Sequence, residues 1–126
     1  MDTSAIFSTN LEEATIQNTN FRTVIFTGNH LQLVLMSLRP GENIGIETHY
    51  HVDQFFRVEK GDGKAVINGT EVELKDGVAF VIRAGEEHDI MNKSDTEDLK
   101  LYTIYAPPNH PDGTIHTTKD DAEEDE

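Results

Sequence analysis

Residues 61–82 read GDGKAVINGTEVELKDGVAFVI, and this stretch alternates turn signals with short strand patterns. Ala65 and Ile67 form a brief alternation that ends at Asn68-Gly69, a strong hairpin signal because both central residues of that turn need positive φ. Within residues 70–75 uncharged and charged side chains alternate, which predicts one buried and one solvated strand face. The stretch therefore predicts antiparallel hairpins.

The same pattern continues on both sides of this stretch. Residues 20–38 contain apolar runs broken by Thr27-Gly28-Asn29, which predicts two strands joined by a turn. Residues 99–105 predict the last strand, which ends before Pro107-Pro108, and no window shows a sustained helical period. Short strands between closely spaced turns predict an all-β sandwich or barrel.

Bulk composition limits the compartment and the partners. The chain has 126 residues, which fits one domain, and its net charge of −14 argues against nucleic acid or an anionic membrane surface as a partner. It has no cysteine, which removes disulfides and thiolate metal sites. Its longest uncharged apolar run, residues 33–36, is too short to cross a bilayer, and the first residues do not resemble a signal peptide. We therefore expect the protein to be cytoplasmic.

The domain organisation follows from shifts in composition. We expect an N-terminal segment over residues 1–19, a barrel over residues 20–106, a C-terminal extension over residues 107–119 that packs on the barrel, and an acidic tail over residues 120–126. The tail reads DDAEEDE, and a run of like charges is expected to stay disordered and solvated. The extension is rich in turn formers, and we expect its His110 and His116 to be surface residues rather than ligands.

A first group of polar residues lies in residues 45–54. In an extended strand Glu47, His49 and His51 point the same way, because side chains alternate with period two. Neighbours on that face lie roughly 7 Å apart, so two of them can converge on a metal about 2.0–2.2 Å from each ligand atom. All three would span roughly 13 Å. We therefore expect one adjacent pair, Glu47 with His49 or His49 with His51, and both alternatives stay open.

Two more inward polar residues are predicted on later strands. Gln54 shares a strand face with Phe56 and Val58, and an inward amide without partners costs about 1–3 kcal/mol. A metal or a bound ligand would satisfy it. His88 precedes Ile90 on one face of a short strand and would also point into the core. Inward polar groups from two hairpins fit a nitrogen and oxygen metal site.

At this point the sequence resembles the cupins, specifically small single-domain bacterial cupins. Their second motif is matched from Gly77 to Asn92 at every spacing, with Arg83 in place of the usual proline. In their first motif Gln54 stands where the family usually has glutamate, and Glu47 and His49 stand at the two histidine positions. The literal H-x-H pair fits only if the connection to Gln54 is shorter than the common form, whereas the pattern E-x-H-x4-Q-F favours Glu47 with His49.

The resemblance implies a fold, a cofactor and an assembly. It implies a double-stranded β-helix, or jelly-roll barrel, that holds one divalent metal ion: Fe, Mn, Ni, Zn or Cu. The implied ligands are His49, Gln54, His88 and either Glu47 or His51. Glutamine in place of glutamate removes one negative charge from the ligand set and should weaken metal binding. Small cupins are commonly dimers, and the face formed by residues 44, 46, 48 and 50 points away from the ligands, so we expect a homodimer.

Two functions remain open from the sequence. In the first, the metal is catalytic and polarises a small oxygenated substrate or binds dioxygen, as in isomerase and dioxygenase members of the family. His51 or Glu47, whichever is not a ligand, is then the candidate general base. In the second, the protein is a non-catalytic binder of a small molecule or a metal. Arg57 and Arg83 could meet an anionic substrate, but a surface charge pair is the favoured interpretation for each.

Overall fold

The structure, a computed structural model, describes residues 6–125. Within that range the elements are α1 (Leu11–Gln17), β1 (Arg22–Thr27), β2 (Gln32–Leu38), β3 (Asp53–Lys60), β4 (Gly63–Ile67), β5 (Thr70–Leu74), β6 (Ala79–Ile82), β7 (His88–Asn92), β8 (Leu99–Ala106), β9 (Ile115–His116) and α2 (Lys119–Glu124).

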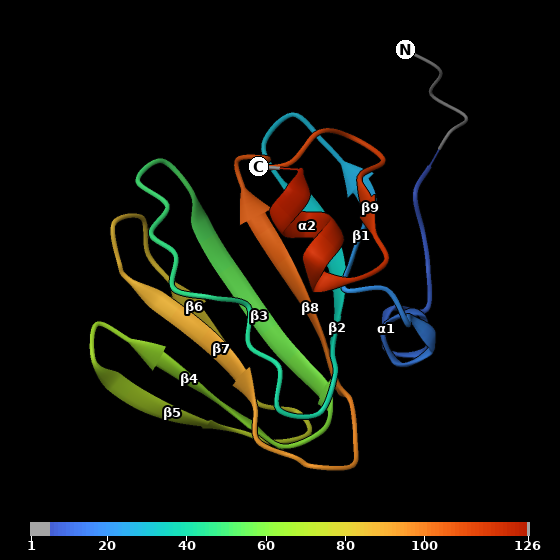
Figure 1. Cartoon of the computed structure of the whole chain (residues 1–126). Coiled ribbons are helices and arrows are strands. Elements are labelled where there is room, and N and C mark those ends of the chain that lie inside the picture. The colour runs from blue at the N-terminus through green and yellow to red at the C-terminus, as the bar shows by residue number, and fades with distance from the viewer. Residues whose placement is uncertain (1–5, 126) are drawn as a thin grey trace.

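The strands form two antiparallel sheets that enclose the core (Figure 1). The larger sheet has the order β6-β3-β8-β2-β1-β9, and the smaller has the order β5-β4-β7. The predicted all-β class is confirmed, and so is the hairpin between β4 and β5. Asn68 and Gly69 have φ values of 48° and 82°, which is the left-handed conformation that this turn requires.

The interior of the larger sheet changes from apolar to polar along the strands. Side chains in register across β2, β8 and β3 form three rows: Met36, Leu101 and Val58; Val34, Thr103 and Phe56; Gln32, Tyr105 and Gln54. All nine are buried. The last row therefore places polar groups inside the barrel at the end where β3 begins, which is where a site can form.

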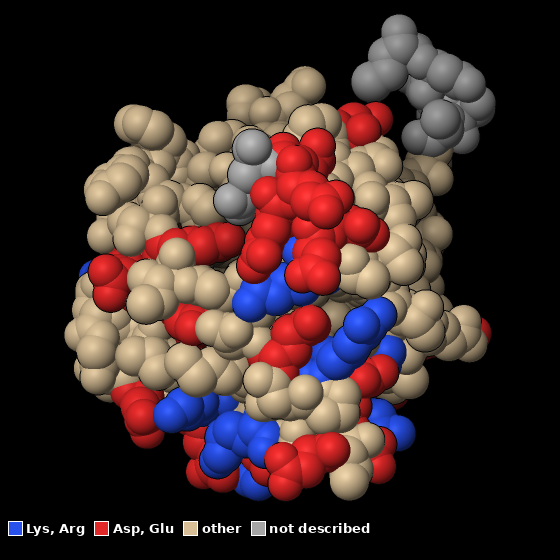
Figure 2. All heavy atoms as spheres, viewed as in Figure 1, with Lys and Arg blue, Asp and Glu red and all other residues tan. Residues whose placement is uncertain are grey.

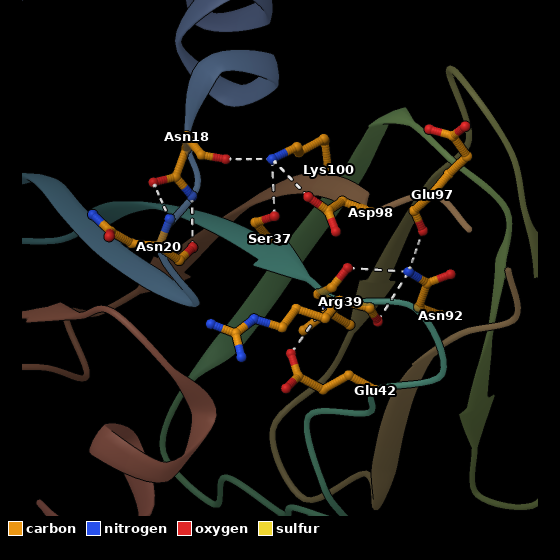
Figure 3. A network of polar contacts seen from close by, with 10 residues as sticks. Asn18, Asn20, Ser37, Arg39, Glu42, Asn92, Glu97, Asp98 and Lys100 are labelled. Carbon is orange, nitrogen blue, oxygen red and sulfur yellow. Dashed lines mark hydrogen bonds and ion pairs between the residues drawn. The ribbon is translucent and has the colours of Figure 1, made fainter. Parts of the chain in front are cut away.

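Polar contacts hold the opposite end of the barrel together (Figure 3). Asn92, at the end of β7, is only 4% exposed, and its Nδ2 lies 3.0, 3.1 and 2.8 Å from the carbonyl oxygens of Leu38, Arg39 and Glu97. Nearby, Nζ of Lys100 donates to the carbonyl oxygen of Asn18 at 2.6 Å. The asparagine that ends the second motif thus ties β7 to the end of β2.

A short helix precedes the barrel, where the sequence predicted none. In α1 the Asn10 side chain caps the first turn by accepting from the backbone N–H of Glu13 at 3.1 Å, and Thr15 is fully buried. The helix packs against β8, β3 and β2. Seven residues make two turns, which is too short for a helical period to be recognised in the sequence. No helix within residues 6–125 is long and apolar enough to cross a membrane.

The acidic tail predicted over residues 120–126 is a helix over most of its length, so the expectation of disorder was wrong there; Glu126 lies outside the described residues. Figure 2 shows the acidic side chains of α2 gathered on one face of the molecule. Two local features explain the helix. Thr118 and Asp121 form a capping box, and the first-turn acids lie at the positive end of the helix dipole. Ala122 is buried and joins the hydrophobic core.

Candidate metal centre

The segment before β3 is held against β7 by backbone hydrogen bonds. Glu47 and His88 exchange two N–H to O=C bonds of 2.9 Å each, so the two residues lie opposite each other in an isolated antiparallel bridge. The continuous strand predicted here does not form. Asp89, which is 5% exposed, accepts from the Gly45 backbone N–H at 2.9 Å and from Asn43 Nδ2 at 2.9 Å. Gly45 has φ of 110°, and this left-handed residue interrupts the pairing.

Three of the predicted site residues come together. Glu47, His49 and His88 each offer one ligand atom, and these atoms all lie within 4.8 Å of one another. Nε2 of His49 is 3.0 Å from Oε2 of Glu47, and the two imidazole centroids are 5.5 Å apart. Ligand atoms about 2.0–2.2 Å from one ion lie no more than about 4.4 Å apart. Small side-chain rotations are therefore enough for all three to reach the same ion.

The orientation of His88 suits it to metal binding. The side chain is buried, and its Nδ1 lies 3.0 Å from the carbonyl oxygen of Glu86. Because a carbonyl only accepts, Nδ1 carries the hydrogen and Nε2 keeps its lone pair. A hydrogen bond to the other ring nitrogen is the usual way in which a protein orients a metal-binding histidine.

Gln54 faces inward, as predicted, and one of its polar atoms lacks a partner. The residue is 3% exposed; its Nε2 donates to Oγ1 of Thr103 at 3.0 Å, whereas Oε1 is buried and has no hydrogen-bond partner within residues 6–125. In register with Gln54 lies Tyr105, whose ring centroid is 6.1 Å from that of His49. The unpartnered oxygen fits a fourth metal ligand from β3.

His51 lies apart from this group. It is exposed and is not among the residues whose ligand atoms converge. Of the two pairs that the sequence left open, the structure brings together Glu47 and His49. The reason is that the chain bends at residues 50–51, so the period-two alternation of an extended strand does not continue to His51.

The electrostatics of the group favour an ionised carboxylate. Burial by itself raises the pKa of Glu47, but the hydrogen bond and charge of His49 outweigh it, and Arg22 and His88 add to the effect. The pKa of Glu47 therefore lies below its ordinary value. Burial raises the pKa of Tyr105 to about 12 and lowers the pKa of His110 to about 4. Near neutral pH the phenol is therefore protonated and the His110 imidazole is neutral.

A cavity of about 300 Å³ opens beside the group. Glu47 and His49 line one side of it, and Arg22, His110, His116 and Asp125 are among the residues that line the rest. The expectation that His116 lies at the surface was wrong: it is 7% exposed, because β9 pairs with β1 and turns the ring inward. His110 is half-buried, with Nε2 3.2 Å from the Tyr105 hydroxyl.

Arg22 is the residue that the sequence analysis missed. It is 7% exposed and lies on β1 opposite His116. A signal was present, because Arg22 and Val24 share one face of a predicted strand, and that face is buried. The two arginines that the sequence offered as contacts for an anionic substrate are both paired. Arg57 forms an ion pair with Glu59 and Arg83 forms one with Glu86, which agrees with the favoured interpretation of each as part of a surface charge pair.

Comparison with known families gives a match over most of the barrel. Residues 34–105 match a family model described as a cupin domain, which is more than half of the chain. The solved structure of BH2720 from Bacillus halodurans superposes with a TM-score of 0.92 at 43% sequence identity, covering 98% of this chain and 97% of that one. The predicted double-stranded β-helix fold is therefore confirmed.

Two curated proteins are similar over nearly the whole chain. YrkC of Bacillus subtilis (strain 168) is 48% identical over 122 residues, which is 92% of this chain and 65% of that protein. Protein L612 of Acanthamoeba polyphaga mimivirus is 46% identical over 113 residues, which is 87% of this chain and 71% of that protein. The chain thus spans just under two thirds of the length of the Bacillus subtilis relative.

Proposed function

We propose that this chain, which belongs to the cupin family, binds one divalent metal ion inside its barrel and uses it to hold a small oxygenated molecule. The proposed ligands are Glu47, His49, Gln54 and His88. One observation carries the proposal: a carboxylate and two imidazoles converge to within 4.8 Å. The buried, unpartnered Oε1 of Gln54 supports it, because a metal would satisfy that oxygen.

The donor set narrows the choice of ion. Two imidazoles, one carboxylate and one amide are nitrogen and oxygen donors, which suit Fe, Mn, Ni, Zn and Cu. With glutamine in place of glutamate the set carries a single negative charge, so we expect binding to be weaker than in a two-carboxylate site. Four protein ligands leave further positions open for a small molecule in a five- or six-coordinate ion.

The residues around the ion define what the site can do. A divalent ion supplies Lewis-acid polarisation of an oxygen of the bound molecule. Glu47 holds its carboxylate ionised, and Tyr105 keeps its proton at neutral pH, so its hydroxyl can donate to His110 beside the cavity. Isomerase or dioxygenase chemistry is the proposed activity. A non-catalytic binder of the same molecule is the alternative, and the exposed position of His51, outside the group, favours it because His51 was a candidate general base.

The test is elemental analysis of protein purified without added metal or chelator. We expect about one equivalent of one of these ions per chain. His88→Ala should lose the ion and still fold, whereas His51→Ala, the same substitution at an exposed histidine two residues from His49, should keep it. A Glu47→Gln variant reports the contribution of the carboxylate. Full metal content in His88→Ala, or loss in His51→Ala alone, would contradict the proposed ligands.

We also propose that the protein is a homodimer. Ile46 and Tyr50, on the segment that carries the ligands, are both 72% exposed, and large apolar side chains that gather on a surface favour an interface. Size-exclusion chromatography with light scattering should give twice the chain mass, and Ile46→Asp should reduce it to the chain mass. A monomer at all concentrations would contradict this. Location in the cytoplasm stays a prediction from composition.

A further inference from the structure

We propose that Arg22 is the anchor for a carboxylate group on the molecule that the cavity accepts. The proposed ligand is thus a small organic acid, with its carboxylate at Arg22 and a second oxygen at the metal centre. This inference rests on the proposed metal centre for the second anchor. The first anchor, Arg22, belongs to a separate part of the chain: it lies on β1, not on the segment that carries Glu47 and His49.

The first observation is a buried cation without a carboxylate partner. Arg22 is 7% exposed, yet within residues 6–125 no Asp or Glu forms an ion pair with it. Its Nε is buried and has no hydrogen-bond partner in that range. Apart from His116, its neighbours are the Phe21 ring, whose centroid lies 5.3 Å from the guanidinium carbon, and Tyr105, while the carboxylate of Glu47 acts on it only through space. Guanidinium groups are buried at a cost unless an anion compensates them.

The second observation is that Arg22 is oriented by a neutral acceptor. Nη1 of Arg22 lies 3.1 Å from Nδ1 of His116, and Nε2 of that histidine lies 2.9 Å from Oδ2 of Asp125. Because arginine only donates, Nδ1 must accept, so Nε2 carries the hydrogen and donates it to Asp125. The carboxylate of Asp125 is therefore engaged by His116, and the guanidinium keeps N–H donors besides the one that His116 accepts.

The third observation is that the cation shares one cavity with two of the proposed metal ligands. Arg22, Glu47 and His49 all line the space of about 300 Å³, which is at the lower end of the volumes found for small-molecule sites. Only a small molecule fits there. Its two ends would meet a cation from β1 and an ion held by the segment before β3.

The charge balance selects an anion. The protein as a whole carries −14, so an anion is not attracted by the general surface. Inside the cavity a divalent ion and Arg22, set against the carboxylates of Glu47 and Asp125, leave one net positive charge, and His110 is neutral at neutral pH. The flat guanidinium pairs best with a planar carboxylate through two parallel hydrogen bonds. A carboxylic acid with a second oxygenated group is therefore the class of ligand that we infer.

The experiment compares matched charged and neutral probes on the metal-loaded full chain. Malonate and succinate are titrated by calorimetry, with malonamide and succinamide as neutral analogues and inorganic phosphate as a second oxyanion. We expect at least one dicarboxylate to bind about 10–100-fold more tightly than its diamide, since a charge-assisted bidentate pair is lost in the diamide. Arg22→Gln should weaken acid binding and narrow that difference while its metal content stays at the wild-type value. Arg39→Gln, which removes an exposed arginine, should leave it unchanged.

The outcomes separate this inference from the proposed function. Equal binding of acid and amide by the wild type, or undiminished acid binding by Arg22→Gln, would overturn it, as would binding of phosphate in place of both acids. If Arg22→Gln does not fold, the inference is tested by Arg22→Lys, which keeps the charge but not the two parallel hydrogen bonds, and by the comparison of acid with amide in the wild type. If the wild type takes up no metal, the metal centre fails first. The acid and amide titrations of the metal-free protein then test Arg22 alone, and loss of the preference there overturns the inference as well.

Discussion

Replacing Asn92 should destabilise the barrel strongly without touching the metal group. Asn92 and His88 are the two ends of β7, and the Asn92 side chain points toward β2 and the loop after β7 rather than toward the cavity. Its Nδ2 serves three carbonyl oxygens, and its Oδ1 accepts from the backbone N–H of Ser94 at 2.9 Å. Asn92→Ala removes all of these contacts at a position that is 4% exposed.

The magnitude follows from the groups left behind. An amide has two N–H hydrogens, so two good bonds to carbonyl oxygens are lost, together with the bond from Ser94. Each buried group left without a partner costs about 1–3 kcal/mol, and water entering the gap recovers part of this. We expect the free energy of unfolding to fall by about 3–5 kcal/mol, which is a large share of the about 5–15 kcal/mol of a typical domain.

An isosteric variant separates hydrogen bonding from packing. Asn92→Asp keeps the shape and the acceptor for Ser94, but it places a carboxylate oxygen against three carbonyl oxygens. It should therefore be at least as destabilising as Asn92→Ala at neutral pH, and less so when acid protonates the carboxylate. If packing were the cause, Asn92→Asp would instead resemble the wild type.

The assay is urea unfolding followed by circular dichroism, with the slope of the transition compared between variants. Asn29→Ala, an exposed asparagine in the turn after β1, is the control and should change stability by less than about 0.5 kcal/mol. Metal content measured on the same samples should match the wild type. A loss below about 1 kcal/mol for Asn92→Ala, or wild-type stability for Asn92→Asp, would refute the reasoning.

Two further predictions concern titration and the buried amide. Burial lowers the pKa of His110 from 6.5 to about 4, so between these values the unfolded chain binds a proton that the folded chain does not, and stability falls as the pH drops through that window. After allowance for partial exposure we expect about 1–2 kcal/mol, measured by urea unfolding of metal-free protein at both ends of the window; an unchanged slope in His110→Gln would contradict it. Gln54→Met removes the unpartnered oxygen along with the bond to Thr103, so metal-free stability should stay within about 1 kcal/mol of the wild type while metal affinity drops. Wild-type metal affinity in Gln54→Met would show that the amide is not a ligand.

Short-range patterns in the sequence were enough to predict the class of the fold and the inward orientation of two of the proposed ligands. The turn at Asn68-Gly69 depends on the conformations of two adjacent residues, and period-two alternation depends only on strand geometry. These rules correctly predicted that the side chains of Gln54 and His88 point inward. The match to the cupin motif from Gly77 to Asn92 then related them to one barrel.

Other features depended on contacts between distant parts of the chain. The helix α2 begins at a local capping box, but it is also held in place because Ala122 reaches the core, and no local rule for like charges includes that contact. The resemblance to the cupins favoured Glu47 over His51, but the physical reason is a bend and two hydrogen bonds to His88, more than 30 residues away in the sequence.

Arg22 shows most clearly which properties follow from the sequence and which follow from the tertiary structure. The sequence by itself determined that the chain alternates between inward and outward side chains on β1, and therefore that residue 22 belongs to a buried face. Only the tertiary structure decided what lies beside it, because the pairing of β1 with β9 joins residues 94 positions apart. Alternation is a property of one strand, whereas the partner of a buried charge is set by which strands pack together.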